Sequence, residues 1–383
     1  MNILLIGEYS NVHNNLAEGL RTLGHQVTLA NDGNGWKHFH SDIDLHRDLT
    51  FCGRITYICR LLKAMRRMKG YDVVQLINPH CLQLKAGRVI PFVKYLRRHN
   101  KKLVVCALGE DYYYCYMHRK YKPQRYSDYN IGDKETMTAY ALAQYNECVG
   151  TDKERLTRVA ISQCDAIVSA IHEYWKPYDM VTDKDASGRP VRVKNHFIPL
   201  PIKMPDAPTV PGQSEKLRVF IGIQKARSEY KGTDIMLKAA RALMQQYPDK
   251  MELKIAENQP FAEYKTMMDN SDVMLDQVFS YGPGMNALLA LSKGIVCLSG
   301  GEPENYDLMG EKECRPIVNV TPSYDVVYRQ LEKLVLMPKE KLQALKAESR
   351  EYARRNHDNV RVARQYESLY QSLLSPPFTP MMA

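Results

Sequence analysis

A loop in the second half of the chain has residues suited to binding an anion. Its sequence is Phe279-Ser280-Tyr281-Gly282-Pro283-Gly284-Met285-Asn286. An apolar run at 272–275 precedes the loop. A helical run at 287–291 and a second apolar run at 295–298 follow it. This order predicts a βαβ unit. Ligands bind at the carboxyl ends of such strands, and the free N–H groups of the helix N-terminus attract anions. The two glycines allow the backbone to come close to a ligand. The alternative is a tight loop without a ligand.

A second loop, at 222–232, contains basic residues that could neutralise phosphates. It lies between a strand expected at 216–221 and a helix expected at 233–246, and it contains Lys225, Arg227 and Lys231. Together with the amides around 282–286, these cations could stabilise the negative charge of a bound phosphate. The alternative is a loop whose charges are simply solvated.

Further candidates lie at strand ends in the first half. Glu110 and Asp111 follow a strand expected at 102–108 and precede three tyrosines, 112–114. Carboxylates accept hydrogen bonds from sugar hydroxyls and aromatic faces stack on sugar rings, so the group suits a sugar; the alternative is a helix N-cap. His13, in the loop after the first strand, could orient an acceptor or the sugar, although a lone histidine is more often structural.

Strand-like and helical runs alternate along the whole chain around these loops. The alternation predicts two doubly wound, Rossmann-like α/β domains that face a central cleft. A proline-rich stretch at 199–212 marks a linker. We therefore expect an N-terminal domain at 1–205 and a C-terminal domain at 206–355. A helical segment at 356–383 would pack back toward the first domain, and the tyrosine-rich residues 115–133 are expected to form a long functional loop.

Composition favours a globular protein. The 383 residues are 44% hydrophobic and 25% charged, which is typical of soluble chains of about two domains. We find no run of 18 apolar residues, and the first residues resemble a strand rather than a signal peptide. The nine cysteines form no CxxC pair, which favours buried, reduced thiols in the cytoplasm and argues against a zinc site. The first βαβ unit lacks GxGxxG, so a dinucleotide fingerprint is absent.

The net charge of +10 is distributed unevenly. Two basic runs lie in the first half: Arg54, Arg60, Lys63, Arg66, Arg67, Lys69 and Lys94, Arg97, Arg98, Lys101, Lys102. Such patches attract anionic surfaces. We expect an anionic membrane surface rather than nucleic acid, because no RNA-recognition signature or zinc finger accompanies them. A cytoplasmic protein, peripheral on the inner membrane face, would fit; the alternative is solvated helix faces.

The chain resembles the GT-B glycosyltransferases, and in particular the large retaining family 4 (group 1). The resemblance covers nearly all residues in architecture and about 219–304 in motifs. The matching strings are Lys231-Gly232, the loop 279–282 with the helix 287–292, Gly300-Gly301-Glu302-Pro303-Glu304, and Asn195-His196-Phe197-Ile198-Pro199. The two glutamates of the family motif fall on Phe279 and Ala287, and its first basic residue falls on Ile223. Polar residues that could replace the glutamates are Asp276, Asn286, Glu302 and Glu304.

This resemblance implies a hexosyltransferase that moves a sugar from a nucleotide-diphosphate donor to a glycan or lipid-linked acceptor. It also implies that 1–205 is the acceptor-side domain and 206–355 the nucleotide-sugar-binding domain. Retention would follow from front-face attack, in which a phosphate oxygen takes the acceptor proton, without metal or cofactor. The implied catalytic residues are Arg227, Lys231, His13, Glu110 and Asp111, and the implied donor-binding residues are Lys225, Gly282, Gly284, Met285, Asn286, Asp276, Glu302 and Glu304. The missing glutamates motivate one alternative, a catalytically inactive GT-B module that binds a sugar nucleotide or a partner protein. A sugar-nucleotide epimerase is a weaker alternative, because its usual acid cluster is not visible.

Overall fold

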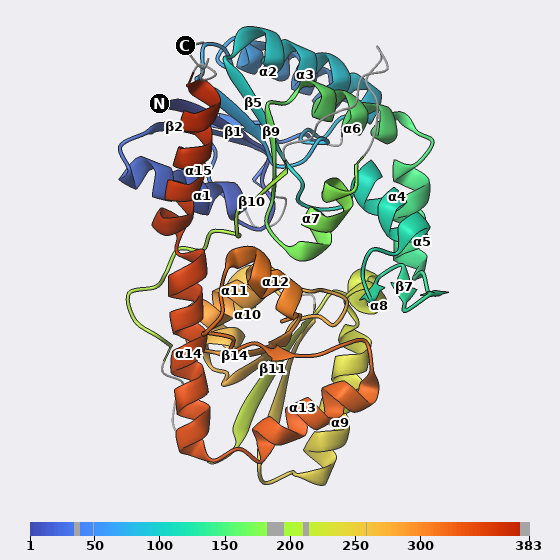
Figure 1. Cartoon of the computed structure of the whole chain (residues 1–383), viewed down its shortest axis with the longest axis vertical. Helices are drawn as coiled ribbons and strands as arrows, with labels where there is room; N and C mark the ends of the chain where they lie inside the picture. Colours follow the sequence, from blue (N-terminus) through green and yellow to red (C-terminus); the bar gives the residue numbers. More distant parts are fainter. Residues whose placement is uncertain (34–38, 49, 182–194, 210–213, 258, 376–383) are drawn as a thin grey trace, which may run out of the picture.

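The structure is a computed structural model that describes residues 1–33, 39–48, 50–181, 195–209, 214–257 and 259–375. It contains two parallel β-sheets, each covered by helices on both faces and stacked along the long axis of the molecule (Figure 1). The predicted fold class, two doubly wound α/β domains, is confirmed. Residues 210–212 of the predicted linker and 376–383 of the predicted last segment lie outside the described residues. None of the described helices has the length and hydropathy needed to span a membrane.

The first sheet has seven parallel strands in the order β10-β9-β5-β4-β1-β2-β3. They are β1 (Asn2–Ile6), β2 (Gln26–Asn31), β3 (Ile43–Asp44), β4 (Val73–Leu76), β5 (Lys102–Cys106), β9 (Ala166–Ser169) and β10 (Asn195–Phe197). Ile3 and Leu5 of β1 pack in one core, and Leu4 and Ile6 pack in another on the opposite face. Both faces of a strand are therefore buried, which explains its continuous apolar sequence.

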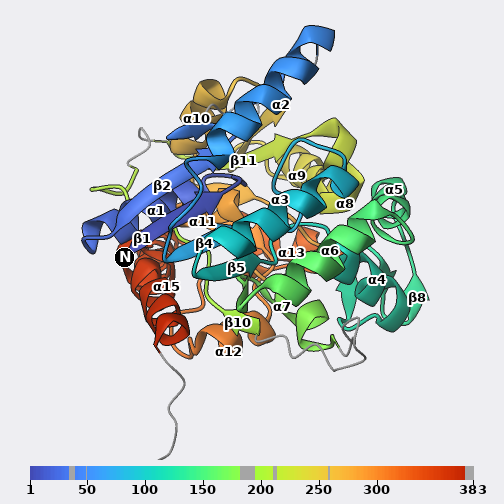
Figure 2. The same cartoon turned by 90° about the horizontal axis from the view of Figure 1, so that it is seen from above.

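Helices cover the two faces of the first sheet unequally. On one face lie α2 (Phe51–Met65), α3 (Ala86–His99) and α6 (Asp152–Gln163), and Figure 2 looks down on this layer. On the other face lie α1 (Val12–Thr22) and the C-terminal α15 (Asn359–Leu374). Gly19 allows α1 and α15 to approach closely, because a Cβ atom there would lie 2.2 Å from the carbonyl oxygen of Asn359.

The second sheet has five parallel strands in the order β12-β11-β13-β14-β15. They are β11 (Leu217–Ile223), β12 (Met251–Glu257), β13 (Val273–Leu275), β14 (Val296–Ser299) and β15 (Val318–Asn319). The helices α9 (Thr233–Gln246) and α13 (Tyr324–Val335) pack on one face. On the other face lie α10 (Phe261–Asp269), α11 (Met285–Ser292) and α14 (Lys339–His357).

The chain passes between the two domains at two adjacent points. Ile202 on the way out donates its N–H to the carbonyl oxygen of His357 at 2.7 Å, and Asn359 on the way back donates to the carbonyl oxygen of Ile202 at 3.0 Å. Beyond this point α15 packs along α1, and Tyr370 donates its hydroxyl to Gln75 Oε1 of β4 at 2.7 Å. The last helix therefore belongs to the packing of the first sheet.

The prediction of a long loop at 115–133 is wrong. The chain there forms α4 (Tyr112–Tyr121) and the start of a small antiparallel sheet, and α5 (Ala139–Cys148) follows. The strands of this sheet are β6 (Tyr126–Ser127), β7 (Asn130–Ile131) and β8 (Lys134–Glu135). Tyr112, Tyr113 and Tyr114 are consecutive and all buried, so α4 is covered on several sides. An apolar stripe with helical period, which would have revealed it in the sequence, is therefore missing.

Candidate active site

A cavity of about 510 Å³ lies between the two domains. The first domain contributes the loops after β1, β5 and β9, together with tyrosines of α4 and α5. The second domain contributes the segments that follow β11 and β13. These segments all leave the carboxyl ends of strands, and β1 and β11 are the strands where the order of each sheet reverses. Open α/β sheets bind their ligands at this position.

The segment after β11 is more ordered than the predicted loop at 222–232. It forms a short 3-10 helix (Lys225–Arg227) and the single-turn α8 (Ser228–Lys231). Gly232 ends α8 with φ of 68°, and a Cβ atom there would lie 2.1 Å from Val278 Cγ2. The backbone N–H of Val278 donates to the carbonyl oxygen of Lys231 at 3.0 Å. Glycine at 232 thus lets the end of α8 contact the loop after β13.

Arg227 lines the cavity between two aromatic rings. Its guanidinium carbon lies 5.4 Å from the ring centre of Tyr140 and 4.9 Å from that of Tyr230, within range of a cation–π interaction. Its Nη2 is 3.7 Å from Glu110 Oε1, which also accepts the hydroxyl of Tyr140 at 3.2 Å. Arg227 Nε has no hydrogen-bond partner in the described part of the chain. The two predicted site residues Arg227 and Glu110 are thus brought together from opposite domains.

Lys231 lines the same wall of the cavity and is half-buried. Burial lowers the pKa of its ammonium group, and the nearby carboxylate of Asp276 opposes this shift. Asp276 itself is buried beneath the cavity wall, where it accepts the hydroxyl of Ser299 at 3.0 Å. A bound phosphate group would therefore favour the charged lysine, because an opposite charge raises the pKa of a buried amine.

The helix α11 directs its N-terminus toward the cavity. Gly284 is its N-cap and has no side-chain cap, so the first backbone amides of α11 donate no hydrogen bond to a capping side chain. Gly284 and Met285 both line the cavity. Gly282 does not, because it packs against Asn305, where a Cβ atom would lie 2.7 Å from the amide carbon. Asn286 is half-buried and also lies outside the cavity lining.

Glu173 is a site residue that the sequence did not indicate. It belongs to α7 (His172–Asp179) of the first domain, is 6% exposed, and lines the cavity. Its carboxylate accepts hydrogen bonds from the hydroxyl of Ser280 and, at 3.3 Å, from the N–H of Tyr281. Burial raises its pKa to about 7, although these hydrogen bonds oppose the shift. The only sequence signal is that it closely follows the apolar run that forms β9.

Three further predicted site residues lie outside the cavity. His13 is fully buried, donates Nδ1 to Gly7 O at 2.8 Å and accepts from Gln75 at 3.2 Å, and burial lowers its pKa to about 4. Asp111 is the N-cap of α4 and accepts from the N–H of Tyr114 at 3.0 Å, as the alternative reading proposed. Lys225 is 77% exposed, and its Nζ lies 2.8 Å from Glu257. Each of these side chains has a structural or surface partner instead of facing the cavity.

Glu302 and Glu304 also lie outside the cavity lining, because they hold the two domains together. Arg125 of the first domain donates to Glu302 Oε2 at 2.6 Å and to Glu304 Oε1. Tyr126 donates its hydroxyl to Glu302 Oε1 at 2.7 Å. The backbone N–H of Arg125 donates to the hydroxyl of Tyr281 at 2.8 Å. These carboxylates are therefore engaged in the domain interface and are not available to replace the glutamates of the resemblance.

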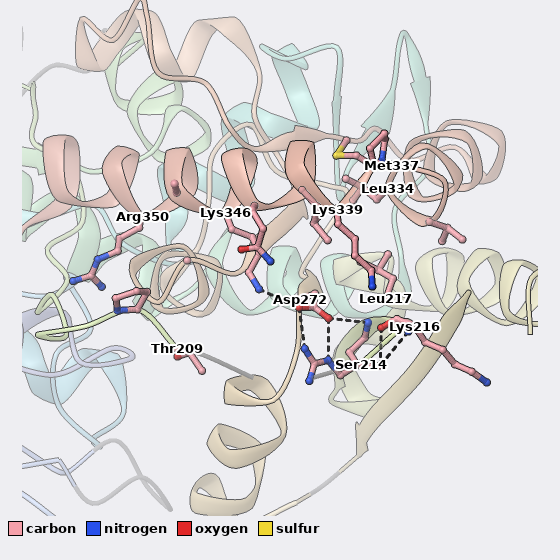
Figure 3. A pocket seen from close by; sticks show the side chains of 18 of the residues that line it. Thr209, Ser214, Lys216, Leu217, Asp272, Leu334, Met337, Lys339, Lys346 and Arg350 are labelled. Atoms are coloured by element: carbon pink, nitrogen blue, oxygen red, sulfur yellow. Dashed lines mark hydrogen bonds and ion pairs between the residues drawn. The ribbon is translucent and has the colours of Figure 1, made fainter. Parts of the chain in front are cut away.

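A larger cavity, of about 810 Å³, lies at the opposite end of the second sheet (Figure 3). Asp272 lies at its centre, 2.9 Å from Arg218 Nε and 3.0 Å from Lys346 Nζ. Burial opposes ionisation of Asp272, but these two cations lower its pKa. Arg350 donates to the carbonyl oxygens of Ser292 and Pro205, both at 2.7 Å. The buried charges of this cavity are paired with one another and with the backbone, which indicates a structural role.

No family model matches this chain, and no curated protein matches its sequence. Solved structures match over nearly the whole length. HepE from Anabaena, in complex with UDP-glucose, is 12% identical with a TM-score of 0.60 and covers 97% of this chain and 100% of its own. Sucrose-phosphate synthase from Thermosynechococcus elongatus is 11% identical with a TM-score of 0.59 and covers 97% and 99%.

WaaG, a glycosyltransferase involved in lipopolysaccharide biosynthesis, is 13% identical with a TM-score of 0.55 and covers 97% of this chain and 99% of its own. The matches also include a putative UDP-N-acetylglucosamine 2-epimerase from Listeria monocytogenes, 10% identical with a TM-score of 0.51. At such identities the likeness concerns the fold alone. The chain has the two-domain GT-B fold.

Proposed function

We propose that the protein is a glycosyltransferase that moves a sugar from a nucleotide-diphosphate donor to a glycan or lipid-linked acceptor. One observation carries this proposal: Arg227, Lys231 and the N-terminus of α11 line one cavity between two GT-B domains. In the reaction, the bond between the anomeric carbon and the diphosphate breaks and its electron pair leaves with the diphosphate. The two cations and the helix amides would stabilise the charge that develops there.

The part of the cavity lining that comes from the first domain suits the sugar. It carries the carboxylates of Glu110 and Glu173 beside the rings of Tyr114, Tyr140 and Tyr174. We propose that the carboxylates accept hydrogen bonds from sugar hydroxyls, while the rings stack on the sugar. Glu173 would thus act near Phe279, where the family 4 resemblance places a glutamate.

We also propose that the reaction retains the configuration of the anomeric carbon. The acceptor oxygen would attack the anomeric carbon on the face that the diphosphate leaves, and a phosphate oxygen would take the acceptor proton. This route needs no strong protein base, which agrees with the burial of His13 outside the cavity.

A panel of nucleotide sugars, beginning with UDP-glucose, tests the proposal. Each donor is incubated with the full chain, with and without glycan acceptors, and the released nucleotide is measured. We expect at least one donor to be turned over faster than in the absence of protein. If no donor is turned over but calorimetry detects nucleotide binding, the inactive sugar-nucleotide-binding module is favoured. Interconversion of the donor sugar without release of nucleotide would favour the epimerase.

Turnover is expected to survive removal of metal ions. The proposed site neutralises the diphosphate with side chains and helix amides, and the described residues contain no cluster of three or more His, Cys, Asp or Glu suited to a metal ion. Nucleotide release is measured before and after treatment with EDTA. Loss of turnover that manganese restores would contradict this expectation.

We further propose that the protein attaches to anionic membranes through α2 and α3. The two helices carry six of the eleven residues of the basic runs, and the side chain of one of them, Arg54, lies outside the described residues. The helices contact each other, since Tyr95 of α3 donates its hydroxyl to the carbonyl oxygen of Met65 at 2.7 Å. Ile58 and Leu62 of α2 are 37% and 58% exposed. An exposed apolar surface between basic side chains suits the interface of an anionic bilayer.

Sedimentation with vesicles tests this attachment. We expect binding to vesicles that contain anionic lipid at low ionic strength and weaker binding as salt is raised, because ions screen the attraction. Leu62→Ser should weaken binding without changing the charge. Equal binding to neutral and anionic vesicles would argue against an electrostatic contribution.

A further inference from the structure

A third, smaller cavity of about 160 Å³ lies within the first domain. Its walls come from the loops after β1, β2 and β4, so it opens at the carboxyl end of the first sheet, where the strand order reverses. This volume is several times the roughly 30 Å³ that one water molecule occupies in the liquid. It is much smaller than the cavity between the domains and suits a single sugar ring better than a nucleotide sugar.

The buried carboxylate of Glu8 lines this cavity and is only half satisfied. Glu8 is 2% exposed. Its Oε2 accepts from the backbone N–H of Asn14 at 2.9 Å and from the Asn14 side chain at 2.8 Å. Its Oε1 has no hydrogen-bond partner among the described residues. Buried polar atoms in native proteins nearly always have a partner, so the unpartnered oxygen indicates that a donor from outside the chain completes the site.

The other polar groups of the cavity favour a ligand without negative charge. Asp32 provides a second carboxylate, which accepts from the side chain of Gln83. His80 is held with Nε2 donating to the carbonyl oxygen of Leu84 at 2.6 Å, and burial lowers its pKa. Among the residues that the structure describes, no lysine or arginine lines the cavity. Arg47 contacts the rim, where it donates to the carbonyl oxygen of Gln83 at 2.8 Å. A phosphate or carboxylate in the cavity would face two acids.

We propose that this cavity binds an uncharged sugar ring of the acceptor, which donates a hydroxyl hydrogen bond to Glu8 Oε1. This inference rests on the proposed glycosyltransferase function. Tyr9 lines both this cavity and the cavity between the domains. A ring held at Glu8 can therefore present a second hydroxyl past Tyr9 toward the donor. The acceptor is thereby narrowed to glycans whose accepting residue carries no phosphate or carboxylate.

Binding of small glycosides to the full chain tests the proposal. The probes are the methyl glycosides of glucose, galactose, mannose and N-acetylglucosamine, with glucose 6-phosphate as the anionic counterpart, and binding is followed by saturation-transfer NMR. At least one neutral glycoside should bind saturably, and glucose 6-phosphate should not displace it. Glu8→Gln turns the acceptor at Oε1 into a donor without changing the shape, and should weaken binding about tenfold or more.

Two further variants and one independent ligand complete the design. Glu18→Gln, at an exposed carboxylate of α1 that pairs with Lys203, is the matched control and should bind the glycoside as the wild type does. Asp32→Asn replaces Glu8→Gln if the latter does not fold, and should also weaken binding. UDP binding, measured by calorimetry, should be the same in the wild type and in Glu8→Gln, because Glu8 does not line the cavity between the domains.

The possible failures are distinct. The inference is overturned if no neutral glycoside binds up to its solubility limit, if Glu8→Gln and Asp32→Asn leave binding unchanged, or if glucose 6-phosphate binds more tightly than the neutral probes. If glycoside binding depends on Glu8 but no nucleotide sugar is bound or turned over, the proposed transferase function fails while the cavity remains a sugar site.

Discussion

Replacing Lys231 or Arg227 with alanine should lower kcat by about 10²-fold or more, the scale observed when one preorganised charge stabiliser is removed. Both cations line the cavity between the domains, where the charge of the leaving diphosphate grows as the transition state forms. Their contribution should therefore be larger in the transition state than in the ground state, and nucleotide affinity should fall less than kcat. Steady-state kinetics and calorimetry on the two variants measure the two effects.

The chain offers a matched control for this experiment in the same segment. Lys225 lies two residues before Arg227, but its Nζ pairs with Glu257 outside the cavity, so Lys225→Ala should retain wild-type kcat. Melting curves accompany the kinetics, because Lys231 is half-buried beside Asp276 and its removal would leave that carboxylate less compensated. Folded variants of Lys231 and Arg227 with wild-type kcat would place the donor site elsewhere.

The wild type should lose stability as pH rises through neutrality because of Glu173, and the Glu173→Gln variant should not show this loss. Burial raises the pKa of Glu173 from 4.5 to about 7 in the folded protein. A carboxyl group of this kind binds its proton more tightly when folded. Its contribution to stability is therefore complete below pH 4.5 and is lost as pH rises through about 7. The loss attributable to this residue is about 3 kcal/mol, at 1.36 kcal/mol for each pKa unit.

Denaturant unfolding of the wild type and Glu173→Gln at a series of pH values measures this contribution. At pH 4.5 and below, the two proteins should be similarly stable, because glutamine has the shape of the protonated acid. At about pH 8 the variant should be more stable by about 3 kcal/mol. Asp111, whose pKa burial raises to about 6, is present in both proteins, so its contribution cancels. A constant difference across this pH range would show that Glu173 does not titrate near neutrality.

The sequence by itself determined the fold class and the position of the main phosphate-binding candidates. Apolar runs such as 3–6 and 296–298 are buried on both faces, and this local pattern is sufficient to predict covered parallel strands. For a related reason, the sequence placed four residues correctly at the cavity: Arg227, Lys231, Glu110 and Gly284. Each follows a predicted strand closely, and the carboxyl ends of parallel strands gather at one edge of a sheet, so proximity in sequence to a strand end implies proximity in space.

Only the tertiary structure decided which of the other polar residues face the cavity. Glu173 contacts Ser280, 107 residues away in the sequence, and Glu302 is engaged by Arg125, 177 residues away. Nothing local specifies such pairs, because they depend on how the two domains are placed against each other. The same applies to Glu8, whose unpartnered oxygen becomes informative only when the packing shows that the residue is buried and that no donor from the described residues reaches this oxygen. Secondary structure follows from the order of neighbouring residues, whereas burial and the choice of hydrogen-bond partner follow from the packing of segments that are distant in the chain.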